Sequence, residues 1–183
     1  VRAVESLAAF GPKAKAALPG ILIAMHEFQS PLLAAEAVRK IGVDEETVPH
    51  LIKAAAGKTA EGRMHSAALL GSIGPGAKDA VPCLAELLSD KIPATAQEAG
   101  GALRKIDPDG KLALPHLMTM LHQKRPEVRM AAVDHMRKLG VAATEIIPAL
   151  SEALKDEDHN VREIAVLALA EFGPAAKEAA PMV

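Results

Sequence analysis

Aromatic side chains are nearly absent from this 183-residue chain, which has three Phe and no Trp or Tyr. Half of its residues are hydrophobic, and Ala and Leu dominate among them. Strands favour aromatic and β-branched residues, whereas Ala and Leu are strong helix formers. The composition therefore favours closely packed helices over a sandwich or a barrel.

Three further shortages narrow the possible functions. The one cysteine, Cys83, cannot form an internal disulfide, and its position after Pro82 predicts a small core residue rather than a reactive thiol. No apolar stretch reaches the roughly 20 residues of a membrane span. The net charge of −2 gives no overall attraction to nucleic acid or to an anionic membrane. We expect no membrane partner, and the cytoplasm is the default location because no signal segment is visible.

Proline, by contrast, returns with a fixed period. Six prolines are separated by 30 residues once and then by 33 residues four times: Pro19, Pro49, Pro82, Pro115, Pro148 and Pro181. A helix-ending residue precedes each by seven or eight positions: Gly11, Gly42, Gly74, Asp107, Gly140 and Gly173. A constant period of this size predicts stacked structural repeats rather than one globular core.

Each repeat is predicted to contain a helix A with the proline, a turn and a helix B. In the last complete repeat the apolar residues of helix B recur at spacings of three and four, which predicts one buried face: Val161, Ala165, Val166, Leu169 and Phe172. A proline inside helix A removes a hydrogen bond, so we expect helix A to be kinked or in two parts. The expected B helices cover residues 31–41, 61–73, 94–106, 126–139 and 160–172.

Two motifs suggest a family. The pattern Gly-Pro-x-Ala-Lys-x-Ala-x-Pro occurs at residues 11–19, 74–82 and 173–181. An Asp in the turn and a Val-Arg at the start of helix B occur together at Asp156, Val161 and Arg162. The chain resembles the HEAT repeats in both respects, and its short units are similar to the bacterial HEAT-like repeats also known from phycobilin lyase subunits. Ankyrin and tetratricopeptide repeats fit less well, because their Thr-Pro-Leu-His and aromatic signatures are missing.

The Asp and Arg of the turn are both present in that last repeat alone. Elsewhere one of them is replaced: Arg63 is matched with Gly57, Arg129 with Gln123, and Asp90 with Ala96. Where both are present, we expect the pair to support the turns between repeats. The residues assigned to the structural repeat motif are Pro49, Pro82, Pro115, Pro148, Asp156, Val161 and Arg162.

The resemblance implies an all-α, right-handed superhelix, a HEAT-like solenoid of about five to six two-helix repeats. We expect a single array over residues 1–183, with units at 1–10 (partial), 11–41, 42–73, 74–106, 107–139, 140–172 and 173–183 (partial). Both ends fall inside a repeat and no polar capping repeat is visible. We therefore expect a fragment of a longer array, whose uncapped ends allow self-association.

No motif for catalysis, metal binding or phosphate binding is present. His50 and His116 both follow a repeat proline, but they are two repeats apart, about 20 Å, which is too far to share a metal. The pair His26-Glu27 is alone, whereas the HEAT-repeat enzyme deoxyhypusine hydroxylase holds iron with several such pairs. Gly100-Gly101 is interpreted as a close-packing or irregular helix position. We expect no cofactor, no metal and no enzymatic activity.

The B helices line the concave face of HEAT arrays, so the resemblance directs attention to them. Three B helices carry a basic pair at the same offset, here called the basic strip: Arg39, Lys40, Arg104, Lys105, Arg137 and Lys138. Met130 lies among the remaining positions of this face. Two interpretations stay open. The basic strip binds an acidic peptide or a phosphate chain, or its cations only complement the dipoles of the helix ends.

The sequence thus predicts a non-catalytic scaffold for protein–protein interaction, with another protein as its partner and nucleic acid as the less favoured ligand. Two alternatives remain. One is an accessory subunit of an enzyme such as a phycobilin lyase. The other is binding of nucleic acid or an acidic ligand through the basic strip.

Overall fold

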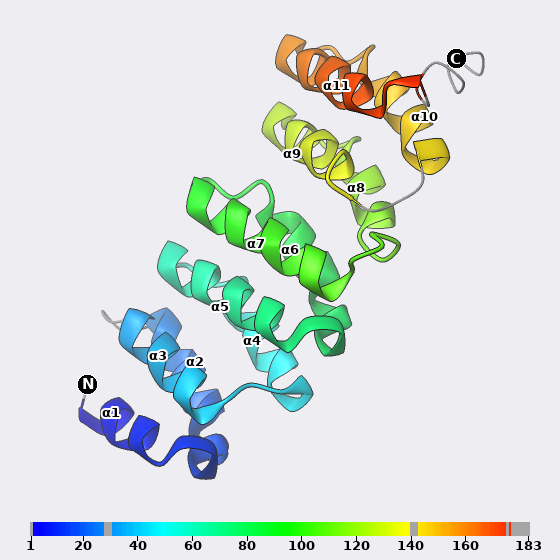
Figure 1. Ribbon diagram of the computed structural model, residues 1–183. Helices are drawn as coiled ribbons and strands as arrows, with labels where there is room; N and C mark the ends of the chain where they lie inside the picture. Colours follow the sequence, from blue (N-terminus) through cyan, green and yellow to red (C-terminus); the bar gives the residue numbers. More distant parts are fainter. Residues whose placement is uncertain (1, 28–30, 140–142, 175, 177–183) are drawn as a thin grey trace. The chain divides into compact units, whose positions relative to one another are not determined.

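Helices account for all the regular structure in the described part of the chain. The computed structural model describes residues 2–27, 31–139, 143–174 and 176 (Figure 1). The chain divides into two compact units, unit 1 (Val1–Ile106) and unit 2 (Asp107–Val183). Each unit is described by itself below.

Unit 1 has two layers of helices (Figure 1). One layer contains the B helices, α1 (Arg2–Ala9), α3 (Pro31–Ile41), α5 (Ala60–Ile73) and α7 (Pro93–Ile106). The other contains the A helices, α2 (Leu18–Glu27), α4 (Val48–Ala55) and α6 (Val81–Leu87). Helix α5 packs against α3 and α7 within its layer, while α4 packs on α5 and α6 packs on α7. Unit 1 is therefore a stack of helix pairs, as the period predicts.

Unit 2 repeats this arrangement with two helix pairs. Helices α8 (Leu114–Met120) and α10 (Ala143–Ala153) are its A helices, and α9 (Pro126–Met136) and α11 (His159–Phe172) are its B helices. Helix α9 packs against α11, α8 packs on α9, and α10 packs on α11. The all-α repeat fold predicted from the sequence is confirmed.

The repeat proline starts the A helices rather than interrupting them. Pro19, Pro49, Pro82 and Pro115 are the second residues of α2, α4, α6 and α8, where a missing N–H removes no helical hydrogen bond. In unit 1 a 3₁₀ segment precedes each of the first three: η1 (Gly11–Ala17), η2 (Glu45–Thr47) and η3 (Gly74–Ala80). Helix A of unit 1 is thus in two parts, as expected. Pro148 differs, because it lies inside α10.

Glycine closes helix B where the sequence predicts it. The φ angles are positive, between 52° and 90°, at four predicted positions: Gly11, Gly42, Gly74 and Gly173. Asp107, the one non-glycine residue of this series, does not adopt positive φ. Its buried carboxylate accepts the Ala113 N–H at 2.7 Å, and the positive φ moves to Gly110, at 70°. Gly140 and Pro181 lie outside the described residues.

One glycine sets the contact between α5 and α7. A Cβ placed on Gly71 would lie 2.9 Å from the Cα of Ala102, closer than real Cβ contacts come. Gly71 therefore allows the two helices to pack with almost no space between their backbones. Of the two interpretations given for Gly100-Gly101, close packing does not apply at Gly101, because a Cβ there would meet no atom within 4 Å. Gly100, its neighbour, is buried in α7.

Two details of the B helices differ from the prediction. Helix α9 ends at Met136, short of the predicted residue 139, because the last amides bond three residues back rather than four, as in Leu139 N–H to Met136 O at 3.2 Å. Val166, expected on the buried face of α11, is 55% exposed, whereas the equivalent Val133 of α9 is fully buried. Helix α11 packs against α9, but among the described residues no further B helix packs against α11.

Replacing Gly71 by Ala is expected to lower the free energy of unfolding by about 1–3 kcal/mol, since the new methyl group has to push α7 away. Gly101→Ala is the matched control in α7. It is expected to raise the free energy of unfolding by about 0.5–1 kcal/mol, because open space surrounds it and Ala favours a helix. Urea denaturation followed by circular dichroism measures both effects, and effects of the same sign would contradict the close contact.

Candidate functional site

Two successive repeats of unit 1, those of α5 and α7, are joined by an arginine in helix B. Arg63 of α5 donates from Nε and Nη2 to the two carboxylate oxygens of Asp90, at 2.6 and 3.0 Å, and Asp90 lies 27 residues further along the chain. Its Nη1 donates to the carbonyl oxygens of Gly57 and Lys58, at 3.1 and 3.0 Å. One guanidinium therefore connects its own turn to the turn of the next repeat. We call this arrangement an Arg–Asp bridge.

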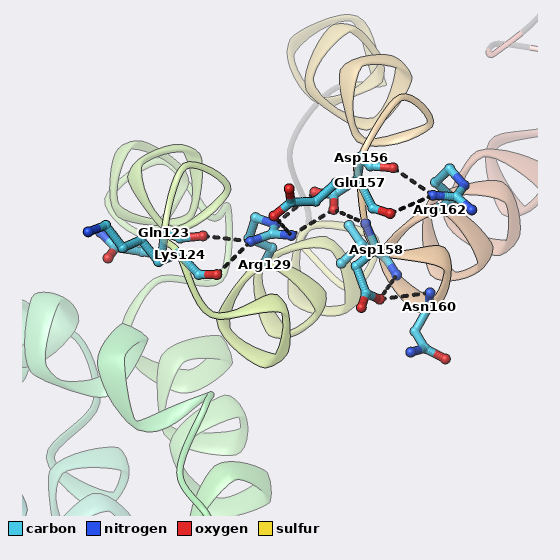
Figure 2. Close-up of polar contacts among 9 residues, drawn as sticks. Gln123, Lys124, Arg129, Asp156, Glu157, Asp158, Asn160 and Arg162 are labelled. Carbon is cyan, nitrogen blue, oxygen red and sulfur yellow. Dashed lines mark hydrogen bonds and ion pairs between the residues drawn. The ribbon is translucent and has the colours of Figure 1, made fainter.

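Unit 2 contains the same bridge (Figure 2). Arg129 of α9 donates to both carboxylate oxygens of Asp156 at 2.8 Å, again over 27 residues, and to the carbonyl oxygens of Gln123 and Lys124 at 2.8 and 3.0 Å. Asp156 also accepts the N–H of Asp158 at 2.9 Å. Asp158 in turn accepts the first amides of α11 and caps the helix.

The bridges pair residues of neighbouring repeats, which corrects the sequence analysis. Arg162 was matched with Asp156 of its own repeat, but it donates to the backbone oxygens of Asp156 and Glu157, at 2.8 and 3.0 Å (Figure 2). The carboxylate of Asp156 accepts from Arg129 instead. An oppositely charged partner within the same repeat is missing for Arg63, Asp90 and Arg129. Each of them pairs instead with a charged residue of the next repeat or the previous one. The constant separation of 27 residues was the signal in the sequence.

Both bridges are largely covered. The side chains of Arg63 and Asp90 are 18% and 6% exposed, and those of Arg129 and Asp156 are 7% and 12% exposed. Hydrogen bonds from the arginines lower the pKa of Asp90 and of Asp156. A polar hollow of about 380 Å³ lies beside the second bridge, between Leu121 and Glu157. Since its buried charges are already paired with each other, we interpret this place as structural.

The unit 1 part of the basic strip is accessible. Arg39 and Lys40 lie in the last turn of α3, and Arg104 and Lys105 lie in the last turn of α7. All four side chains are exposed, and none forms an ion pair with another described residue. These cations are therefore available to a ligand.

The unit 2 part is occupied by acids of the protein itself. Arg137 contacts Asp134 at 2.7 Å and Glu171 at 2.6 Å, and Lys138 contacts Asp134 at 2.6 Å. Partial burial by itself raises the pKa of Asp134, but the hydrogen bonds from Lys138 and Arg137 outweigh it and leave that pKa lowered. The sequence analysis missed Asp134, although its spacing of three and four residues from the cations was visible. Met130, half-buried on α9, belongs to the same unit.

Helix α5 has no basic pair, and the reason is its close packing against α7. The equivalent positions in α5 are Gly71 and Ser72. Any side chain at position 71 would collide with Ala102, so an arginine has no room there. Ser72 is exposed, and its hydroxyl donates to the Leu69 carbonyl at 2.6 Å.

No reactive site is indicated by the cysteine or by the histidines whose side chains are described. Among the described residues no group of three or more His, Cys, Asp or Glu is placed to hold a metal ion. His50 is exposed on α4 and His116 is half-buried on α8, whereas the His26 side chain lies outside the described part. Burial raises the pKa of the Cys83 thiol to about 11, with Glu86 adding to the effect. In the part of the chain that the structure describes, no helix is long and apolar enough to cross a membrane.

Removing either partner of the Arg129–Asp156 bridge is expected to destabilise the protein. Arg129→Met or Asp156→Asn should lower the free energy of unfolding by about 1–3 kcal/mol, because the partner's buried charge loses its hydrogen bonds. The double variant should cost less than the sum of the two. Arg162→Met is the control, since it removes bonds to exposed carbonyls alone. Chemical denaturation measures all four, and strict additivity would contradict the bridge.

The same bridge sets a pH dependence. Because the folded pKa of Asp156 lies below its unfolded value, its contribution is present above about pH 4 and is lost as the pH falls through the folded pKa. The difference in stability between the wild type and Asp156→Asn should therefore shrink on acidification. A constant difference between pH 7 and the acid limit of folding would contradict this.

Cys83 is expected to react slowly with iodoacetamide at pH 8, since a thiol with a pKa of about 11 holds almost no thiolate there. The rate in the folded protein should be at least tenfold lower than in urea, where the thiol regains its ordinary pKa. Mass spectrometry of the alkylated protein gives both rates, and equal rates would show that the thiol is not buried.

Comparison with known proteins agrees with the repeat architecture. The family model of HEAT repeats matches residues 48–137 and 114–183. None of the curated proteins matches the chain. Among solved structures, an engineered protein is similar at 20% identity with a TM-score of 0.45, covering 95% of this chain and 89% of that one. A designed armadillo repeat protein, in complex with the peptide (KR)4, is similar at 18% identity with a TM-score of 0.43, covering 94% and 91%. Since the HEAT matches together cover well over half of the sequence, the chain belongs to the HEAT repeat family.

Proposed function

We propose that this chain is a non-catalytic scaffold that holds a segment of another protein on its B helices. The supporting observation is a set of exposed side chains at equivalent positions of successive B helices, which contribute neither to the core nor to an Arg–Asp bridge. In unit 1 these are Arg39 and Lys40 on α3, Ser72 on α5, and Arg104 and Lys105 on α7.

Other residues than this exposed set stabilise the fold of unit 1. Helices α3, α5 and α7 each bury an apolar face, with Val38, Leu70 and Leu103 almost fully covered. The Arg–Asp bridge of Arg63 and Asp90 connects the turns between helix A and helix B. The exposed row therefore remains free, and it repeats from helix to helix at about 10 Å per helix. A surface with this regular spacing suits an extended ligand that crosses several helices.

The titratable groups also favour a scaffold over an enzyme. Catalytic acids, bases and nucleophiles usually have pKa values shifted toward their task. In the described residues the lowered pKa values of Asp90, Asp134 and Asp156 are each explained by an arginine or lysine partner. Partial burial, and then the nearby Arg39, lower the pKa of His65. The raised pKa of Cys83 makes it a poorer nucleophile.

Photocrosslinking tests the proposed face. A photoreactive amino acid at Ser72 of α5 or Gln97 of α7, both exposed, is expected to capture a protein in cells that produce the full-length chain. Glu86, exposed on the A helix α6, is the matched control and should capture none. Adducts are resolved by gel electrophoresis and identified by mass spectrometry. Adducts at Glu86 alone, or at all three positions equally, would contradict binding on the B helices.

A further inference from the structure

We infer that the partner's segment is acidic and that unit 1 binds it at the ends of α3 and α7. The surface consists of Arg39, Lys40, Arg104 and Lys105, here called the basic edge. This inference rests on the proposed function, because it specifies the chemistry of the ligand on the same B helices.

The two basic pairs lie on the same edge of unit 1. A Cβ placed on Gly11 would lie 3.7 Å from the carbonyl oxygen of Lys40, and one on Gly74 would lie 4.0 Å from that of Lys105. Both glycines occupy the same place in the repeat, where the chain leaves helix B. The end of α3 thus lies beside the turn at Gly11, and the end of α7 lies beside the turn at Gly74. These turns are equivalent, so both basic pairs lie on the same side of the stack of helices in unit 1.

The cations of the basic edge lack internal partners. Arg137 and Lys138 of α9 contact Asp134, but α7 has Gly101 at the equivalent position before Arg104 and Lys105. Glu36 takes this position in α3, yet it forms no ion pair with Arg39 or Lys40 among the described contacts. Arg39 lies near enough to His65 of α5 to help lower the pKa of that imidazole, but no described acid pairs with any of the four cations. The dipoles of the helix ends complement their charges. A carboxylate from outside would supply the missing partner.

The surface between the two pairs is low. It is formed by the last turn of α5, which packs against both α3 and α7. Gly71 has no side chain, and Ser72 has only a hydroxyl that bonds to its own helix. Gly71 is buried against Ala102, so the exposed residue of the two is Ser72, which places no long side chain between the basic pairs.

The spacing defines the segment further. Helices α3 and α7 are separated by α5, so the basic pairs are two interhelical distances apart, about 16–20 Å. An extended chain advances about 3.3 Å per residue. The best ligand therefore has two acidic clusters separated by about five residues.

The same surface is poorly suited to nucleic acid. Helices α3, α5 and α7 contain no Phe, Trp or Tyr on which a base would stack, and the imidazole of His65 in α5 is half-buried. Glu36 and Glu98 are exposed on α3 and α7, and they would repel a chain with a charge on every nucleotide. A peptide can place neutral residues opposite these acids, so the observations favour a protein segment.

Fluorescence anisotropy with a defined probe tests the inference. The probe is a fluorescein-labelled peptide titrated with the whole chain. It has two Glu-Glu pairs with about four Gly and Ser residues between them, which puts the centres of the pairs about 20 Å apart. It should bind, and Arg104→Gln with Lys105→Gln should weaken binding about three- to tenfold. The matched control is Arg137→Gln with Lys138→Gln, at the same offset. It should leave the affinity unchanged, because those cations are already paired with Asp134 and Glu171.

Three results would overturn the inference: equal binding of a peptide with Gln in place of Glu, equal binding of a peptide with a one-residue spacer, or tighter binding of single-stranded DNA of similar length. Photocrosslinking separates this inference from the proposed function. Adducts at Ser72 and Gln97 with a partner that has no acidic segment would overturn the acidic chemistry and leave the scaffold in place. The absence of adducts there would remove the scaffold itself.

Discussion

A guanidinium that serves two repeats at once is the interaction on which the turns of this protein depend. Arg63 and Arg129 each use Nη1 for two carbonyl oxygens of their own turn and Nε with Nη2 for a carboxylate of the next repeat. Arginine suits this task because its donors point in fixed directions around a planar group. Lysine would place one compact charge there and leave acceptors unbonded. The turn and the stacking of the next helix pair are thus held by the same side chain.

The bridges also determine which surface is free for binding. They occupy the edge where helix A turns into helix B, and the apolar faces of the helices form the core. The opposite edge, where helix B ends, is closed by positive φ at residues such as Gly11 and Gly74, and in unit 1 also by an ion pair between Lys15 and Asp44. The cations of the basic edge form no ion pair there among the described residues. This is why the cations of Arg104 and Lys105 are exposed while that of Arg129 is not.

The fold followed from the sequence because its signals are local and repeated. A proline that is tolerated at a helix start, and a glycine that adopts positive φ, have the same consequence in each copy. The bridges were missed because they are between copies. Matching Asp156 with Arg162 was wrong because alignment of repeats compares positions within one unit, whereas the bridge connects one unit with the next. The contact of Arg137 with Glu171 also joins two repeats, whereas its contact with Asp134 lies within one helix, at a spacing that the sequence displays.

The constant separation of 27 residues in the Arg–Asp bridge limits how the length of a repeat protein of this kind can change. The two partners are 27 residues apart and belong to different 33-residue units, so duplication of a whole unit copies an arginine and an aspartate that again meet in register. An insertion within the segment from Arg63 to Asp90 would instead have to be absorbed by a loop, or it would separate the charges. The shorter 30-residue interval between Pro19 and Pro49 lies outside that segment. Growth by entire units is therefore the route that preserves each junction.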